Sequence, residues 1–221
     1  MRFYRIFMYK HLGPAFSLLA LAALPVCAAD INTFSFSSGM NCNGVWKLPD
    51  TGQALCYNAS GQSACPVSGF PGQDAQYTPA AVQMSYTVLN PVGISSVTVD
   101  NVTGLMWVTN PQTDAGFKDM QTWESALTSC TVTLNGMAYG GYTDWRLPNV
   151  SELMSIMDYG KASEPYINAA AFPGAVSYYY WASTSWGLDP FNALFVPFGP
   201  GGVGYNDKTN SVYVRCVRGG P

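Results

Sequence analysis

The sequence predicts an α+β fold, with two amphipathic helices followed by a half of the chain that is rich in strands. Apolar residues recur at helical spacing over 120–130 and again over 150–157. After residue 178, β-branched and aromatic segments alternate with glycine and proline turns. Charged residues make up only 10% of the chain and aromatic residues 14%, which favours short strands and turns over a helical bundle. Helices and strands in separate parts of a chain are typical of the α+β class.

Residues 1–29 have the pattern of a signal peptide, with a basic start followed by an apolar run over 12–26. The run is shorter than the roughly 20 apolar residues of a membrane-spanning helix, and the small residues after it permit cleavage after Ala28 or Ala29. We therefore expect an exported protein without a membrane span, secreted into the periplasm or medium or held at the cell surface. The competing interpretation is lipid anchoring at Cys27.

Cleavage there leaves seven basic and 13 acidic residues, a net charge near −6, which disfavours binding to nucleic acid or anionic membranes. The single histidine, His11, lies in the signal peptide. Histidine-based catalytic sites and histidine-ligated metal sites are thereby excluded. We expect a binding protein with no cofactor and no metal, not an enzyme. The alternative is a carboxylate-dependent enzyme that acts on envelope glycans.

Five cysteines follow the signal peptide, and in an exported chain such residues are typical of disulfides. Cys56 and Cys65 lie nine positions apart, a spacing that predicts a bridge closing a small local loop. Because five is an odd number, at least one cysteine is free, intermolecular or otherwise modified.

Two parts follow the signal peptide: a leader segment over 30–97, rich in Gly, Ser, Pro and Asn, and a main domain over 98–221. We expect the leader to be irregular and β-rich, with short strands over 82–89 and 94–99. The main domain is predicted to begin with a strand over 102–108.

The first helix of the main domain is predicted to begin after Asp119, whose carboxylate can cap it. Its apolar residues place Cys130 on the buried face, near the helix end. The residues of that face are Met120, Trp123, Leu127 and Cys130.

The second helix is predicted to begin at Asn149, which forms a capping-box pattern with Glu152 three residues later. It ends before Gly160, and its core face comprises Val150, Leu153, Ile156 and Met157. Just before it, Asp144 and Arg146 are interpreted as an ion-pairing or turn-stabilising pair rather than as catalytic groups.

The strand-rich half has its clearest strands over 178–184, 193–198 and 211–218. In the last of these, alternation places Val212, Val214 and Cys216 on one face.

Four motifs follow one another along the main domain. They are Asp-Asn-Val-Thr-Gly-Leu-Met-Trp at 100–107, Asp-Trp-Arg-Leu-Pro at 144–148, Tyr-Trp-Ala-Ser-Thr at 180–184 and Val-Arg-Cys-Val-Arg at 214–218. In this order and spacing, the region over 99–220 resembles the C-terminal domain family of the Legionella collagen-like adhesin. The segment over 48–53 also resembles the leader that often precedes such domains.

The resemblance implies a C-type-lectin-like fold: two helices, a small twisted antiparallel sheet and long loops that carry the ligand surface. It also implies a disulfide between Cys130 and Cys216, which leaves Cys42 free or available for an intermolecular disulfide. The ligands implied for the named adhesin are sulfated glycosaminoglycans, whereas this acidic chain has too few basic residues to assume a patch for a polyanion. We expect an adhesin or lectin-like module that binds an extracellular glycan or protein.

The ligand surface is predicted within residues 178–210, where aromatic rings can stack on sugars and Asn and Asp can bond hydroxyls. Tyr180 and Trp181 are expected in the core, and a glycine-bounded loop is expected around Tyr205. Related lectin-like domains serve as receptor-binding proteins diversified by retroelements, a further interpretation of this segment. The candidate ligand residues are Tyr178, Tyr179, Trp186, Phe191, Asn192, Tyr205, Asn206, Asp207 and Asn210.

Overall fold

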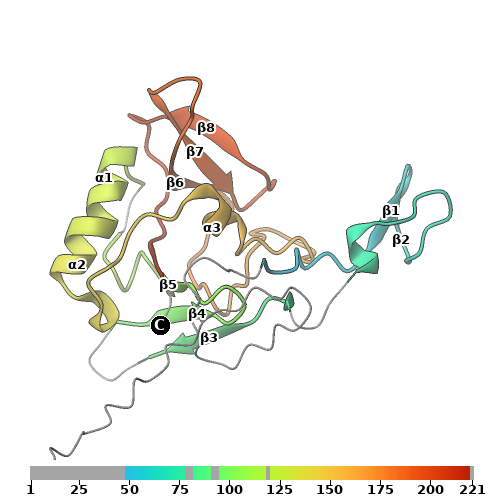
Figure 1. Cartoon of the computed structure of the whole chain (residues 1–221), viewed down its shortest axis with the longest axis horizontal. Helices are drawn as coiled ribbons and strands as arrows, with labels where there is room; N and C mark the ends of the chain where they lie inside the picture. The colour runs from blue at the N-terminus through green and yellow to red at the C-terminus, as the bar shows by residue number, and fades with distance from the viewer. Residues whose placement is uncertain (1–47, 78–81, 91–94, 118–119, 220–221) are drawn as a thin grey trace, which may run out of the picture. The chain divides into compact units, whose positions relative to one another are not determined.

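The computed structural model describes residues 48–77, 82–90, 95–117 and 120–219 (Figure 1). Within these ranges, three short α-helices and small antiparallel sheets confirm the α+β class. The signal peptide, Cys27 and Cys42 lie outside the described residues, and the C-type-lectin-like topology stays a prediction. None of the helices in the described ranges has the length and apolar character needed to cross a bilayer.

The larger sheet has the strand order β3-β4-β5-β9, and all neighbouring strands are antiparallel. Two of its strands come from the boundary region, because β3 lies in the predicted leader and β4 runs across position 97. The predicted strands of this region are present but shorter. Their bounds are β3 (Tyr86–Leu89), β4 (Val97–Asp100), β5 (Met106–Val108) and β9 (Val217–Arg218).

A tight turn replaces the first part of the strand predicted over 102–108. The Asp100 carboxylate accepts hydrogen bonds from the Thr103 hydroxyl at 2.7 Å and from the Val102 amide at 2.9 Å. Gly104 follows with a φ of +74°, a conformation that favours glycine. Hydrogen bonds from the two following turn residues to the Asp100 carboxylate thus end β4 and start β5.

The first helical region runs as α1 (Trp123–Thr128), a π-helical segment (Ser129–Thr133) and α2 (Leu134–Gly136). Its N-cap is Thr122, whose side chain accepts from the Ser125 amide. The predicted cap, Asp119, lies outside the described residues. Met120 precedes the helix and is 41% exposed, so its predicted place on the buried face is wrong. Cys130 is buried as expected, but in mid-helix.

The second predicted helix is α3 (Val150–Met154), and its capping box is confirmed. Asn149 accepts from the Glu152 amide at 2.9 Å, and the Asn149 amide donates to the Glu152 carboxylate at 2.8 Å. Arg146 adds two bonds to the same carboxylate, at 2.6 and 2.7 Å. The helix ends earlier than predicted, although Ile156 beyond it is still fully buried.

The smaller sheet has the strand order β6-β7-β8. Its first two strands confirm the prediction, whereas β8 occupies the segment expected to be a loop. Only the end of the strand predicted over 211–218 is regular, as β9; Val212 and Tyr213 form single bridges to Gln121 and Tyr180. The bounds are β6 (Tyr179–Ser185), β7 (Asn192–Pro197) and β8 (Gly204–Asp207).

Two hydrophobic cores lie on either side of the larger sheet. Met106 and Val108 of β5 belong to the core with α1 and α2, whereas Trp107 between them belongs to the core with α3. The predicted shared face of the last segment is confirmed, because Val212, Val214 and Cys216 all enter the first core. Val217 enters the second, so this segment is buried on both sides.

A buried cation lies in the same segment. Arg215 is fully buried and donates to the carbonyl oxygens of Val108 and Thr109 at 2.9 and 3.2 Å. Its guanidinium lies 5.0 Å from the ring centroid of Phe172, and burial lowers its pKa. Carbonyl dipoles and an aromatic face therefore stabilise this charge, and no carboxylate of the described residues pairs with it.

Both predicted disulfides are confirmed. Cys56–Cys65 ties the hairpin of β1 (Cys56–Asn58) and β2 (Gly61–Ser63). Cys130–Cys216 joins the first helical region to the last segment across 86 positions.

Replacing Cys130 and Cys216 together by serine is expected to lower the free energy of unfolding by about 4–5 kcal/mol, because the bridge closes a long loop and lies in the core. The matched control replaces Cys56 and Cys65, for which the same relation gives about 2–3 kcal/mol. Urea denaturation of both double variants measures the difference. Equal losses in the two double variants would contradict the expectation that the bridge closing the longer loop stabilises the fold more.

Candidate functional site

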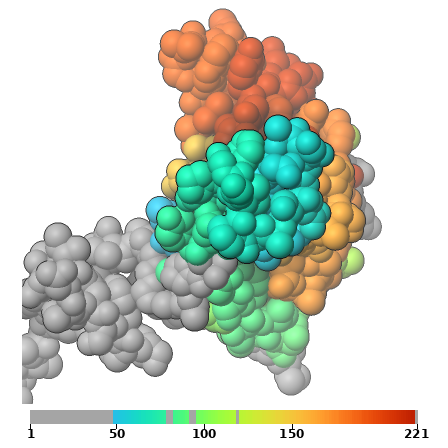
Figure 2. All heavy atoms as spheres, turned by 90° about the vertical axis from the view of Figure 1, so that its right-hand side faces the viewer, coloured from blue at the N-terminus to red at the C-terminus, as the bar shows by residue number. Residues whose placement is uncertain are grey.

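An aromatic pair at the surface connects the residue that follows β6 to β8. The rings of Trp186 and Tyr205 are stacked, with centroids 3.9 Å apart and planes at 10°. Tyr205 is 54% exposed, and the loop before β7 adds Leu188 and Phe191, exposed by 86% and 73%. Figure 2 shows atoms of the β6-β7-β8 sheet, coloured orange to red, at the molecular surface.

Tyr178 and Tyr179 belong to a different aromatic group. The Tyr179 ring lies 4.4 Å from that of Phe195 and 4.8 Å from that of Tyr178. Phe195 covers Gly204, where a Cβ atom would overlap its ring. Successive residues of a strand point to opposite faces, so Tyr205 lies on the face opposite to Phe195. The predicted aromatic residues are thus divided between two faces of the sheet.

The predicted polar ligand residues bond mainly within their own turns. The Asn192 side-chain amide donates to Asp189 at 2.8 Å, and that of Asn210 donates to Asn206 at 2.8 Å. The Asp207 carboxylate accepts from the amide and the hydroxyl of Thr209 at 2.8 and 2.7 Å, and these bonds lower its pKa. These side chains therefore stabilise the β6–β7 connection and the turn after β8.

The electrostatics of residues 178–210 are weakly acidic, with Asp189, Asp207 and one cation, Lys208. The Lys208 ammonium donates to the Pro190 carbonyl at 2.7 Å and lies 4.4 Å from the Trp123 ring centroid. Since this charge is already engaged, the surface offers no basic patch for a polyanion.

The structure also places other side chains that the sequence analysis singled out. Tyr180 and Trp181 are fully buried, as expected for core residues. Asp144 and Arg146 both form ion pairs, although not with each other: Asp144 pairs with Arg218 at 2.6 Å and Arg146 with Glu152. In the described ranges, no three His, Cys, Asp or Glu side chains converge as metal ligands would.

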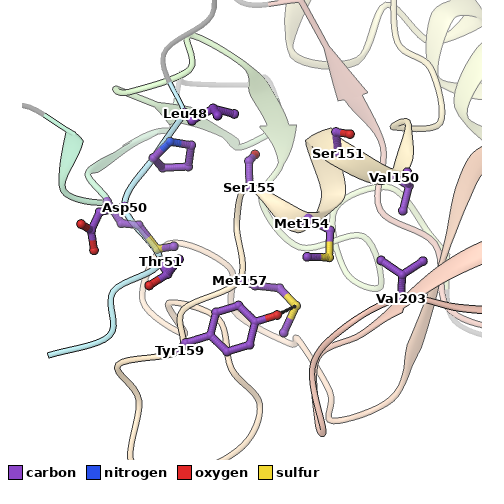
Figure 3. Close-up of a pocket in the computed structure, with 12 residues that line it drawn as sticks. Leu48, Asp50, Thr51, Val150, Ser151, Met154, Ser155, Met157, Tyr159 and Val203 are labelled. Atoms are coloured by element: carbon purple, nitrogen blue, oxygen red, sulfur yellow. Dashed lines mark hydrogen bonds between the residues drawn. The ribbon is translucent and has the colours of Figure 1, made fainter. Parts of the chain in front are cut away.

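A groove of about 440 Å³ is a second candidate site, which the sequence analysis did not find. Figure 3 shows Met154 and Met157 in its centre, between Leu48 of the leader on one side and Val203 on the other. Tyr159 also lines the groove, and its hydroxyl lies 3.7 Å from the sulfur of Met157. The walls come from positions more than 150 residues apart, so no local pattern predicts their meeting.

Comparison with protein families gives one match: a family model described as the Lcl C-terminal domain matches residues 96–218. The match covers more than half of the chain and spans the structure from β4 to β9, including the Cys130–Cys216 bridge. No curated protein matches the chain.

Substituting Tyr205→Ala is expected to lower the free energy of unfolding by only about 0.5–1.5 kcal/mol, because it removes a partly exposed aromatic pair and no core contact. The matched control is Tyr77→Ala, which removes a 65% exposed tyrosine of the leader. That control should stay within about 0.5 kcal/mol of the unaltered protein in urea denaturation. Global unfolding of the Tyr205→Ala variant would show that the stack supports the sheet itself.

Proposed function

Since the chain belongs to the Lcl C-terminal domain family, we propose that it is an adhesin-like module, secreted or displayed at the cell surface, that binds an extracellular glycan or protein. Two disulfides within the described residues support an oxidising location. The weakly acidic surface of residues 178–210 favours a ligand other than a sulfated polyanion.

The stacked Trp186–Tyr205 pair carries this proposal. Stacking covers one face of each ring and holds both rings in place, so the exposed part of Tyr205 is pre-ordered for contact with a sugar ring or a side chain of a partner. Leu188 and Phe191, in the connection between Trp186 and β7, add exposed apolar side chains. Tyr and Trp are also the residues most often found at the energetic centre of protein interfaces.

Three carboxylates of the described residues are engaged in structural bonds. Glu152 pairs with Arg146, Asp144 pairs with Arg218, and Glu164 accepts from the Ser177 hydroxyl. This arrangement supports a binding role over carboxylate catalysis.

The direct test measures binding of the purified protein to an array of neutral and sulfated glycans and, in parallel, capture of proteins from host-cell surfaces. We expect saturable binding to a neutral glycan or a protein, weakened at least about tenfold by Tyr205→Ala and unchanged by Tyr77→Ala. Tyr179→Ala removes a ring from the other face of the sheet and tests whether that face contributes to binding.

Two results would contradict the assignment. One is a ligand whose affinity is insensitive to Tyr205→Ala. The other is selective binding of sulfated glycans, because it would require a basic surface outside residues 178–210.

A further inference from the structure

The groove beside α3 is preformed by backbone contacts of the leader. The Asp50 amide donates to the Val82 carbonyl at 2.7 Å, and the Tyr159 amide donates to the Thr51 carbonyl at 2.8 Å. Gly52 and Gly160 meet so closely that a Cβ atom on Gly160 would overlap the Gly52 carbonyl. The contacts of Thr51 and Gly52 hold the leader against the segment that follows α3, so a ligand would not have to order this wall.

The lining is apolar and adaptable. Met84, Met154 and Met157 contribute three flexible thioether side chains, and Leu48 and Val203 contribute exposed aliphatic ones. Methionine side chains adjust to apolar ligands of differing shape because they are unbranched and polarisable. A volume of about 440 Å³ lies within the range of small-molecule sites.

The described lining residues of the groove carry only negative charge. Among the described lining residues, Asp50 is the one that carries a full charge, and none is Lys, Arg or His. The hydroxyls of Thr51 and Ser155 donate to Asp74 and to the Glu152 carbonyl, so their protons are already engaged. Among the described lining residues, an anionic head group would therefore find a carboxylate and no counter-charge, whereas a neutral or cationic one meets no repulsion.

From this combination we infer that the groove binds a small alkyl or aryl amphiphile with a neutral or cationic head group. The apolar part lies against the methionines, and the head group lies toward Asp50 at the leader side. This site is separate from the Trp186–Tyr205 surface, and its occupancy does not depend on the function proposed for that surface.

The test displaces the fluorescent probe N-phenyl-1-naphthylamine from the full purified protein with three decyl compounds that share one chain length. 1-Decanol and decyltrimethylammonium are expected to displace the probe, and decanoate to require a concentration at least about tenfold higher. This series isolates the charge of the head group. Saturation of the probe in the absence of competitor establishes that there is a site.

A pair of variants locates the site. Val203→Glu places a carboxylate in the groove wall and should lower the affinity for 1-decanol at least about tenfold. Val132→Glu makes the same change at a valine of similar exposure on the first helical region, 65% against 49%, and should leave the affinity unchanged. Circular dichroism of both variants verifies that they are folded.

Three outcomes would each overturn the inference. These are absence of saturable probe binding, equal displacement by decanoate and 1-decanol, and equal affinities in the Val203→Glu and Val132→Glu variants.

Discussion

The structure depends on a final segment, 212–218, that is buried on both sides. Val214 and Cys216 pack with α1 and α2, and Val217 packs with α3 and its neighbours. A shift of one residue in register would exchange these faces and move Arg215 into the position of Cys216. The Cys130–Cys216 bridge excludes that shift, because it fixes one residue of the segment to a buried helix position. Helices and sheet are therefore ordered by one short stretch near the end of the chain.

Burial of Arg215 is the electrostatic consequence of this arrangement. A charge removed from water costs free energy unless the protein supplies dipoles around it. Here the carbonyls of Val108 and Thr109, at the end of β5 and just after it, accept from Nη1, and the Phe172 ring lies beside the guanidinium. Nε and Nη2 have no hydrogen-bond partner among the described residues, so this compensation is partial. The guanidinium thus joins β5 to the last segment beyond the point at which their strand pairing stops. Its role is structural, as is that of the ion pairs of Arg146 and Arg218.

Both candidate sites are connected to the β7–β8 hairpin. Tyr205 in β8 carries the aromatic surface, and Val203, two positions earlier, lines the groove. The Gly202 amide donates to the Tyr159 hydroxyl at 3.3 Å, which connects the turn before β8 to the groove wall. The core beneath this hairpin contains the buried rings of Tyr180, Trp181 and Phe198, whereas Val203 and Tyr205 are exposed. Such a division lets surface residues vary without disturbing the fold.

The sequence by itself determined the α+β class, the capping box at Asn149, the alternation of Val212, Val214 and Cys216, and the local Cys56–Cys65 loop. Each of these follows from neighbours within a few positions, where periodicity and spacing report burial directly. The four ordered motifs also gave the family. Only the tertiary structure made β8 a strand, because its short, polar sequence becomes extended through pairing with β7. It alone divided the aromatic residues between two faces and brought Leu48 to Val203, since contacts between distant segments depend on the whole fold and leave no local pattern.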